Sequence, residues 1–189
     1  MLNIGALMGF FLFSGATMAV PASASAPEVP PLPTHKVTLT AYNAVPEQTD
    51  SDPLVTASGA YSNPEIVAAR SQDLAKDLPF GTIIEIDGPA TSGNSCGFGI
   101  VEPIIGYRII ADTMNARYTD RIDVLFDTES NYTLANGKVK NAGMVLGICN
   151  GATVRVVGFV DIKNPKRLPK TQAELVALVR GASKTIALK

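Results

Sequence analysis

The chain of 189 residues contains no tryptophan, one histidine and two cysteines. The histidine, His35, lies in the proline-rich stretch PEVPPLPTHK, which argues against a Ser-His-Asp or Cys-His catalytic arrangement. A zinc site built on several imidazoles is excluded for the same reason. The segment CGFG lacks the third glycine of a dinucleotide-binding fingerprint. Carboxylates therefore remain as the candidates for acid–base chemistry.

Charged residues are also scarce: they make up 17% of the chain, and the formal net charge is -1. Because no basic cluster is present, the positive surface that nucleic-acid binding requires is missing, and we expect no nucleic-acid partner. Hydrophobic residues account for 46% of the chain, which is typical of a globular protein. The length beyond the N-terminal segment is enough for one domain with a single core.

The N-terminal segment, MLNIGALMGFFLFSGATMAVPASASAPEVP, has a long apolar stretch followed by small residues. The ASA at 24–26 matches the pattern of a signal-peptidase cleavage site. We predict a signal peptide over 1–26, a stiff spacer over 27–35, and export to the periplasm, cell envelope or exterior. No Lys or Arg precedes the apolar stretch, so an uncleaved membrane anchor is the alternative.

The two cysteines are Cys96 and Cys149. In an exported protein, an even number of cysteines favours a disulfide. Two separate buried thiols are the alternative.

Short strands dominate from residue 36 onward. In KVTLTAY, apolar and polar residues alternate with the period of two that is typical of a half-buried strand. Six strands are expected, at 36–42, at 82–88, two within 100–111 separated near Pro103 and Gly106, at 121–126 and at 152–162. Short helices are expected at 71–77 and 139–146. This pattern predicts a mainly β domain, a compact barrel over 36–165.

The C-terminal tail, 166–189, has a helical pattern. Thr171 is a candidate N-cap, Glu174 is in the capping-box position, and Gly181 is the expected stop. Leu175, Leu178 and Val179 form an apolar stripe that predicts packing against the barrel or at its edge.

Aspartates lie beside apolar strand residues in the segment ADTMNARYTDRIDVLF. In RIDVLF, Ile122 and Val124 share one face and Asp123 lies on the other. If that second face lines a groove, burial should raise the pKa of Asp123 and make it a proton donor. A solvated outer face is the alternative. Asp112 ends the run YRIIA and could instead cap the following turn, and Asp73 in SQDL could simply cap a short helix.

Four blocks, in order, resemble the three-aspartate (3D) domain family: TAYNAVPEQTDSDPLVTASG, VAARSQDLAKDLPFGTIIEIDG, YRIIADTMNARYTDRIDVLF and GATVRVVG. They cover residues 38–158. The resemblance implies a six-stranded double-psi β-barrel related to the catalytic domain of membrane-bound lytic transglycosylase A. It also implies action on peptidoglycan.

The same resemblance implies roles for individual residues. Asp123 would be the general acid and then the base, with Asp112 in support. Asp73 would stand for the third family aspartate, since VAAR replaces the usual VAVD. The residues expected to lie near the groove and bind the substrate are Tyr42, Thr56, Ser58, Thr82, Thr113 and Asn115. Met114 and Asn115 occupy the place of a Gly-rich turn found in many members, which leaves the shape of the groove open.

The expected function is therefore that of a lytic transglycosylase, which cleaves between N-acetylmuramic acid and N-acetylglucosamine and forms a 1,6-anhydro product. We expect a monomer that acts on peptidoglycan glycan strands, with no cofactor and no metal. The alternative is a non-catalytic module that binds peptidoglycan or other carbohydrate. A calcium site formed by carboxylates is a further alternative. An aspartic protease is disfavoured because ADT lacks the glycine of an Asp-Thr/Ser-Gly turn.

Overall fold

The computed structural model describes residues 32–90 and 96–187, with side chains to residue 181. The predicted signal peptide, and the predicted spacer up to residue 31, lie outside these residues. Strand β1 begins at Thr34, within the range predicted for the spacer, so Thr34 and His35 belong to the barrel, and His35 pairs with Val154.

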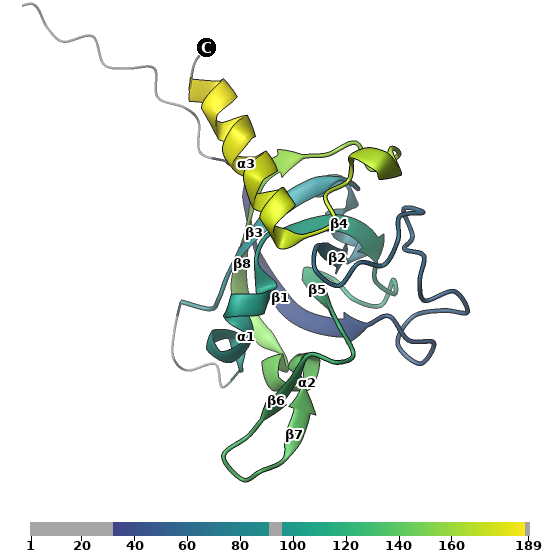
Figure 1. Cartoon of the computed structure of the whole chain (residues 1–189), viewed down its shortest axis with the longest axis vertical. Helices are drawn as coiled ribbons and strands as arrows, with labels where there is room; N and C mark the ends of the chain where they lie inside the picture. The colour runs from purple at the N-terminus through teal and green to yellow at the C-terminus, as the bar shows by residue number, and fades with distance from the viewer. Residues whose placement is uncertain (1–31, 91–95, 188–189) are drawn as a thin grey trace, which may run out of the picture. The chain divides into compact units, whose positions relative to one another are not determined.

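Six strands close into a mixed barrel in the order β1-β5-β2-β4-β3-β8 (Figure 1). They are β1 (Thr34–Asn43), β2 (Val67–Arg70), β3 (Thr82–Asp87), β4 (Arg108–Thr113), β5 (Arg121–Phe126) and β8 (Cys149–Phe159). The pairs β1/β5 and β2/β4 are parallel, and the other four are antiparallel. The predicted fold class, a mainly β six-stranded barrel with short helices and a C-terminal helix, is confirmed.

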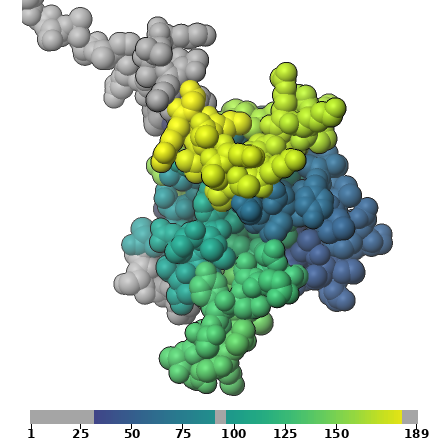
Figure 2. Space-filling model, in the orientation of Figure 1, coloured from purple at the N-terminus to yellow at the C-terminus, as the bar shows by residue number. Residues whose placement is uncertain are grey.

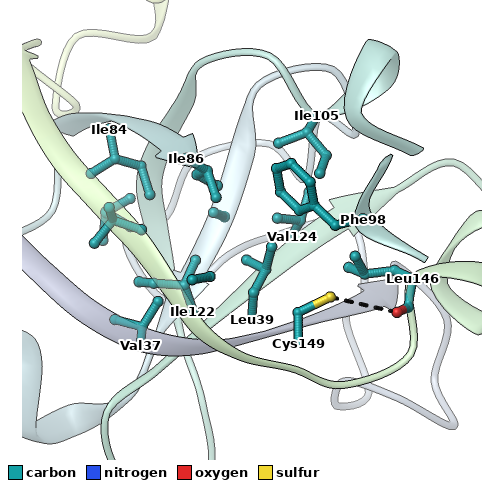
Figure 3. Close-up of a cluster of buried hydrophobic side chains, with 14 of the residues drawn as sticks. Val37, Leu39, Ile84, Ile86, Phe98, Ile105, Ile122, Val124, Leu146 and Cys149 are labelled. Carbon is teal, nitrogen blue, oxygen red and sulfur yellow. Dashed lines mark hydrogen bonds between the residues drawn. The ribbon is translucent and has the colours of Figure 1, made fainter. Parts of the chain in front are cut away.

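Alternation along the strands fills the barrel with aliphatic side chains. Val37 and Leu39 of β1 meet Ile122 and Val124 of β5 in one buried cluster (Figure 3). A second cluster lies on the other face of the strands and includes Leu125. Strand β5 therefore has both faces covered, and Asp123 lies on the side of the second cluster.

Helix α3 (Gln172–Ala187) packs on this second cluster through Leu175 and Val179, as the apolar stripe predicted. Thr171 Oγ1 accepts a hydrogen bond from the Glu174 amide at 3.3 Å, in agreement with the predicted N-cap. The predicted stop at Gly181 is wrong, since the helix continues to Ala187. Gly181 does not have the positive φ with which glycine usually ends a helix.

One predicted strand is also wrong. Residues Phe98–Ile105 form helix α1, whose buried residues are Phe98, Val101 and Ile105, at helical spacing. The segment is so rich in apolar residues that its sequence does not distinguish the two periods. The barrel instead uses β2, which the sequence analysis missed because all four of its residues are buried and show no alternation.

The remaining elements are small. The predicted helix at 71–77 is the 3-10 turn η1 (Gln72–Ala75), and a second such turn is η2 (Pro165–Arg167). The predicted helix at 139–146 divides into strand β7 (Val139–Asn141) and helix α2 (Ala142–Leu146). Strand β6 (Asn131–Thr133) pairs with β7 in a hairpin that projects from the barrel (Figures 1 and 2).

Cys96 and Cys149 form a disulfide, with a Cα–Cα distance of 5.3 Å. The bridge joins the segment before α1 to the start of β8, and it confirms the predicted pairing over the alternative of two thiols. A disulfide is consistent with an oxidising, extracytoplasmic location. Within the described residues, no helix has the length and apolar character needed to cross a membrane.

Candidate active site

A polar groove of about 800 Å³ lies over strands of the barrel. Its floor includes Tyr42, Ala69, Asp112 and Asp123, from β1, β2, β4 and β5. One wall comes from the β1–β2 loop (residues 44–66), and the other comes from the β4–β5 loop (residues 114–120). In Figure 2, the β1–β2 loop is the blue segment at the flank of the molecule.

Strand register explains why Asp112 and Asp123 reach the same groove. Ala69 of β2 is aligned with Asp123 of β5 on one side and with Asp112 of β4 on the other. The two aspartate Cα atoms are therefore two strand spacings apart, about 10 Å. Because Ala69 has only a methyl side chain, it leaves open space between the two carboxylates.

A β-bulge turns Asp112 toward this groove. The β2/β4 register passes from Ile110 opposite Ala68 to Asp112 opposite Ala69, so no residue of β2 is aligned with Ala111. Strict alternation would place Asp112 on the same face as Ile110, whose side chain belongs to the barrel interior. The extra residue reverses this, as bulges beside functional sites often do.

The carboxyl group of Asp123 is largely removed from solvent. Among the described residues, its buried Oδ1 atom has no hydrogen-bond partner. Burial raises the pKa of Asp123 to about 6; a hydrogen bond from Thr40 and the charge of Arg121 act against this, and the charge of Asp112 adds a smaller upward effect. Asp123 is thus able to hold a proton at mildly acidic to neutral pH and to release it.

Asp112 has the opposite environment, because three donors surround it. Its Oδ1 atom accepts hydrogen bonds from the amides of Ala57 and Thr113, both at 2.9 Å. Its Oδ2 atom accepts one from the hydroxyl of Tyr42, also at 2.9 Å. Two backbone donors and a phenol therefore hold this carboxylate in one orientation.

The structure brings together most of the residues predicted for the site. The groove is lined by the predicted residues Tyr42, Thr56, Asp112, Thr113, Asn115 and Asp123.

Three predicted residues lie outside the groove lining. Asp73 is exposed on η1, where a Ser71 hydrogen bond and the Asp120 amide hold its pKa below the usual range. Ser58 lies behind Thr56, with 3.0 Å between the two hydroxyl oxygens. The buried Thr82 donates from its hydroxyl to the Pro79 carbonyl at 2.6 Å and so closes the PFGT turn.

The charged residues on the groove walls were not predicted from the sequence. The β1–β2 loop contributes Glu47, Asp50 and Asp52, whereas the β4–β5 loop contributes Arg117. The Arg117 guanidinium lies over the ring of Tyr118, 4.7 Å from its centroid. The three acidic residues in the run PEQTDSD were the feature of the sequence that could have predicted this acidic wall.

In the part of the chain that the structure describes, no three His, Cys, Asp or Glu side chains come together as a group that could hold a metal ion.

A comparison of the chain with models of known protein families gives no match, and a comparison with curated protein sequences gives none either. The barrel and its groove are shown by the structure, and the three-aspartate family remains a prediction from the sequence blocks.

Proposed function

We propose that the chain is a peptidoglycan lytic transglycosylase that cleaves the bond between N-acetylmuramic acid and N-acetylglucosamine. The observation that carries this proposal is the partly buried Asp123 at the floor of the polar groove, whose pKa is raised and whose buried Oδ1 atom has no partner among the described residues. Perturbed carboxyl groups in clefts are typical of catalytic sites. The mixed six-stranded barrel supports the double-psi fold that the resemblance implies.

In the proposed reaction, protonated Asp123 gives its proton to the glycosidic oxygen as the bond to the muramic acid C1 atom breaks. Positive charge develops at that carbon and its ring oxygen, as in other glycosidic cleavages. The ionised Asp123 then removes the proton from the 6-hydroxyl of the same muramic acid. That hydroxyl attacks C1 and closes the 1,6-anhydro ring, so no water is consumed.

The environment of Asp112 favours this route over ordinary hydrolysis. Hydrolases generally need a second carboxylate that contacts the sugar or activates a water. Both oxygens of Asp112 already accept hydrogen bonds from the protein. A mechanism with one acid–base carboxyl and an internal nucleophile fits this arrangement, because the nucleophile is already positioned by the substrate.

The direct test is to treat isolated peptidoglycan sacculi with the purified protein and to identify the soluble products by mass spectrometry. We expect muropeptides lighter by one water molecule than hydrolytic products. Asp123→Asn should reduce their formation by about 10²- to 10⁴-fold, as expected for loss of a general acid. Asp77→Asn is the matched control, because Asp77 is exposed and lies outside the groove.

Products that carry an added water would contradict the transglycosylase proposal. Absence of products, with the protein still pelleting with sacculi, would favour the non-catalytic wall-binding module instead. Equal activity of Asp123→Asn and the parent would remove Asp123 from the mechanism.

A further inference from the structure

The hydroxyl of Tyr42 ends inside the groove floor, away from solvent. Tyr42 is 8% exposed and donates its hydroxyl proton to Asp112 Oδ2 at 2.9 Å. Burial and then the nearby Asp112 charge raise the pKa of this phenol above its ordinary value. The hydroxyl therefore remains protonated, and can donate, at neutral and mildly alkaline pH.

Asp112 connects the Tyr42 hydroxyl to one wall of the groove. Its other oxygen holds the Ala57 amide at 2.9 Å, and Ala57 and Thr56 both line the groove. Ala57 belongs to the tight turn 56–60, which the Gly59 amide closes on the Thr56 carbonyl at 2.8 Å. A change in the orientation of Asp112 would thus move the wall that faces Asp123.

The turn has a second attachment that does not involve Asp112. The Ser58 amide donates to the Ala111 carbonyl at 3.1 Å, between backbone atoms alone. Neighbouring amides of one turn therefore depend on different partners, Ala57 on the aspartate side chain and Ser58 on the β4 backbone.

We propose that Tyr42 is a positioning residue that acts through Asp112 to keep the 56–60 turn in a fixed position across the groove from Asp123. Among the described residues, no other side chain donates to Asp112 Oδ2. Without the phenol, the carboxylate gains freedom to rotate, and its bond to the Ala57 amide weakens. This role rests on the proposed transglycosylase function only for its effect on rate; the restraint on the turn is independent of it.

Kinetics of Tyr42→Phe in two backgrounds test the coupling. Phenylalanine keeps the buried ring and removes only the hydroxyl. We expect kcat/KM on sacculi to fall about tenfold in the parent, mainly through kcat, and to change less than about twofold in an Asp112→Ala background, which has no side-chain partner for the phenol. Two interacting residues give such non-additive effects, whereas a general loss of packing would lower the rate in both backgrounds.

Amide hydrogen exchange gives a readout that needs no activity. Ala57 is an exposed residue, so its amide is protected chiefly by the bond to Asp112. In Tyr42→Phe, exchange at Ala57 should quicken about tenfold, while exchange at Ser58 should change less than about twofold. Tyr107→Phe is the matched control, since Tyr107 packs at the same second cluster and does not line the groove.

Unchanged protection of Ala57 in Tyr42→Phe, or equal loss of rate in both backgrounds, would overturn the proposal. If the parent protein has no activity on sacculi, the proposed function fails, and the exchange experiment still decides the role of Tyr42.

Discussion

Asp112 and Asp123 lie on either side of Ala69, yet the barrel holds their carboxylates in contrasting ways. Asp112 sits at the end of β4, where a bulge and an adjoining turn offer three donors. Asp123 sits within β5, between Thr40 of β1 and Ala69 of β2; Thr40 gives it a hydrogen bond, and its Oδ1 atom has no partner among the described residues.

The contrast shows how one groove can assign different tasks to the same side chain. A strand end exposes backbone amides that can bind a carboxylate, whereas amides within a barrel are already used by the neighbouring strands. We infer that Asp112 is suited to support, because three donors fix its orientation, and that Asp123 is suited to proton transfer, because burial favours its neutral form.

The largest expected effect on stability comes from the disulfide, and it tests whether the difference between Asp112 and Asp123 depends only on residues near the groove. Replacing both cysteines by alanine removes a bridge that spans 53 residues and should lower the free energy of unfolding by about 4 kcal/mol. Neither cysteine lines the groove, so the pKa of Asp123, followed by carboxyl NMR, should stay near 6. Urea denaturation measures the free energy of unfolding. A shift of the Asp123 pKa would show that the groove depends on the distant bridge.

Asp112→Ala should be the next largest change. It removes the acceptor of the exposed Ala57 amide and the partly buried Thr113 amide, and it leaves the buried Tyr42 hydroxyl unpaired, which is costly. We expect the free energy of unfolding to fall by about 3 kcal/mol at pH 7, measured by urea denaturation. A loss below about 0.5 kcal/mol would mean that water replaces all three hydrogen bonds and that Asp112 does not stabilise this part of the fold.

The pH dependence of the free energy of unfolding should show the contribution of the raised Asp123 pKa. Its pKa is raised from 3.8 to about 6 on folding, so its contribution is fully present below the unfolded value and is lost as pH rises through the folded one. Between pH 4 and pH 7, this group alone should reduce the free energy of unfolding by about 2 kcal/mol. The difference between the parent and Asp123→Asn isolates that part of the curve. Parallel curves for the two proteins would contradict the raised pKa.

The smallest expected effect concerns the acidic wall. Changing Glu47 to Gln and Asp50 and Asp52 to Asn removes three carboxylates from the groove rim. Because these side chains are exposed and screened by salt, the pKa of Asp123 should fall by less than about 0.5 units in 0.15 M salt. Carboxyl NMR measures the shift. A larger fall would make the rim, in addition to burial, a cause of the proton affinity of Asp123.

The sequence alone determined features that depend on near neighbours in the chain. Alternation in RIDVLF correctly separated Asp123 from the barrel interior, and the Thr171 region correctly marked the start of α3. The same local reasoning failed for α1, where apolar residues were too dense to show a period. It also failed for β2, because its four residues are all buried and show no alternation.

The tertiary structure alone decided how the aspartates differ. Nothing local in the sequence marks the bulge at Ala111 that turns Asp112 into the groove, because the bulge exists only in the pairing of β4 with β2. Nor could spacing show that Asp73 would bind the Asp120 amide outside the groove. Periodicity records which side of a strand a residue occupies, whereas burial and hydrogen bonding depend on segments that meet only when the barrel closes.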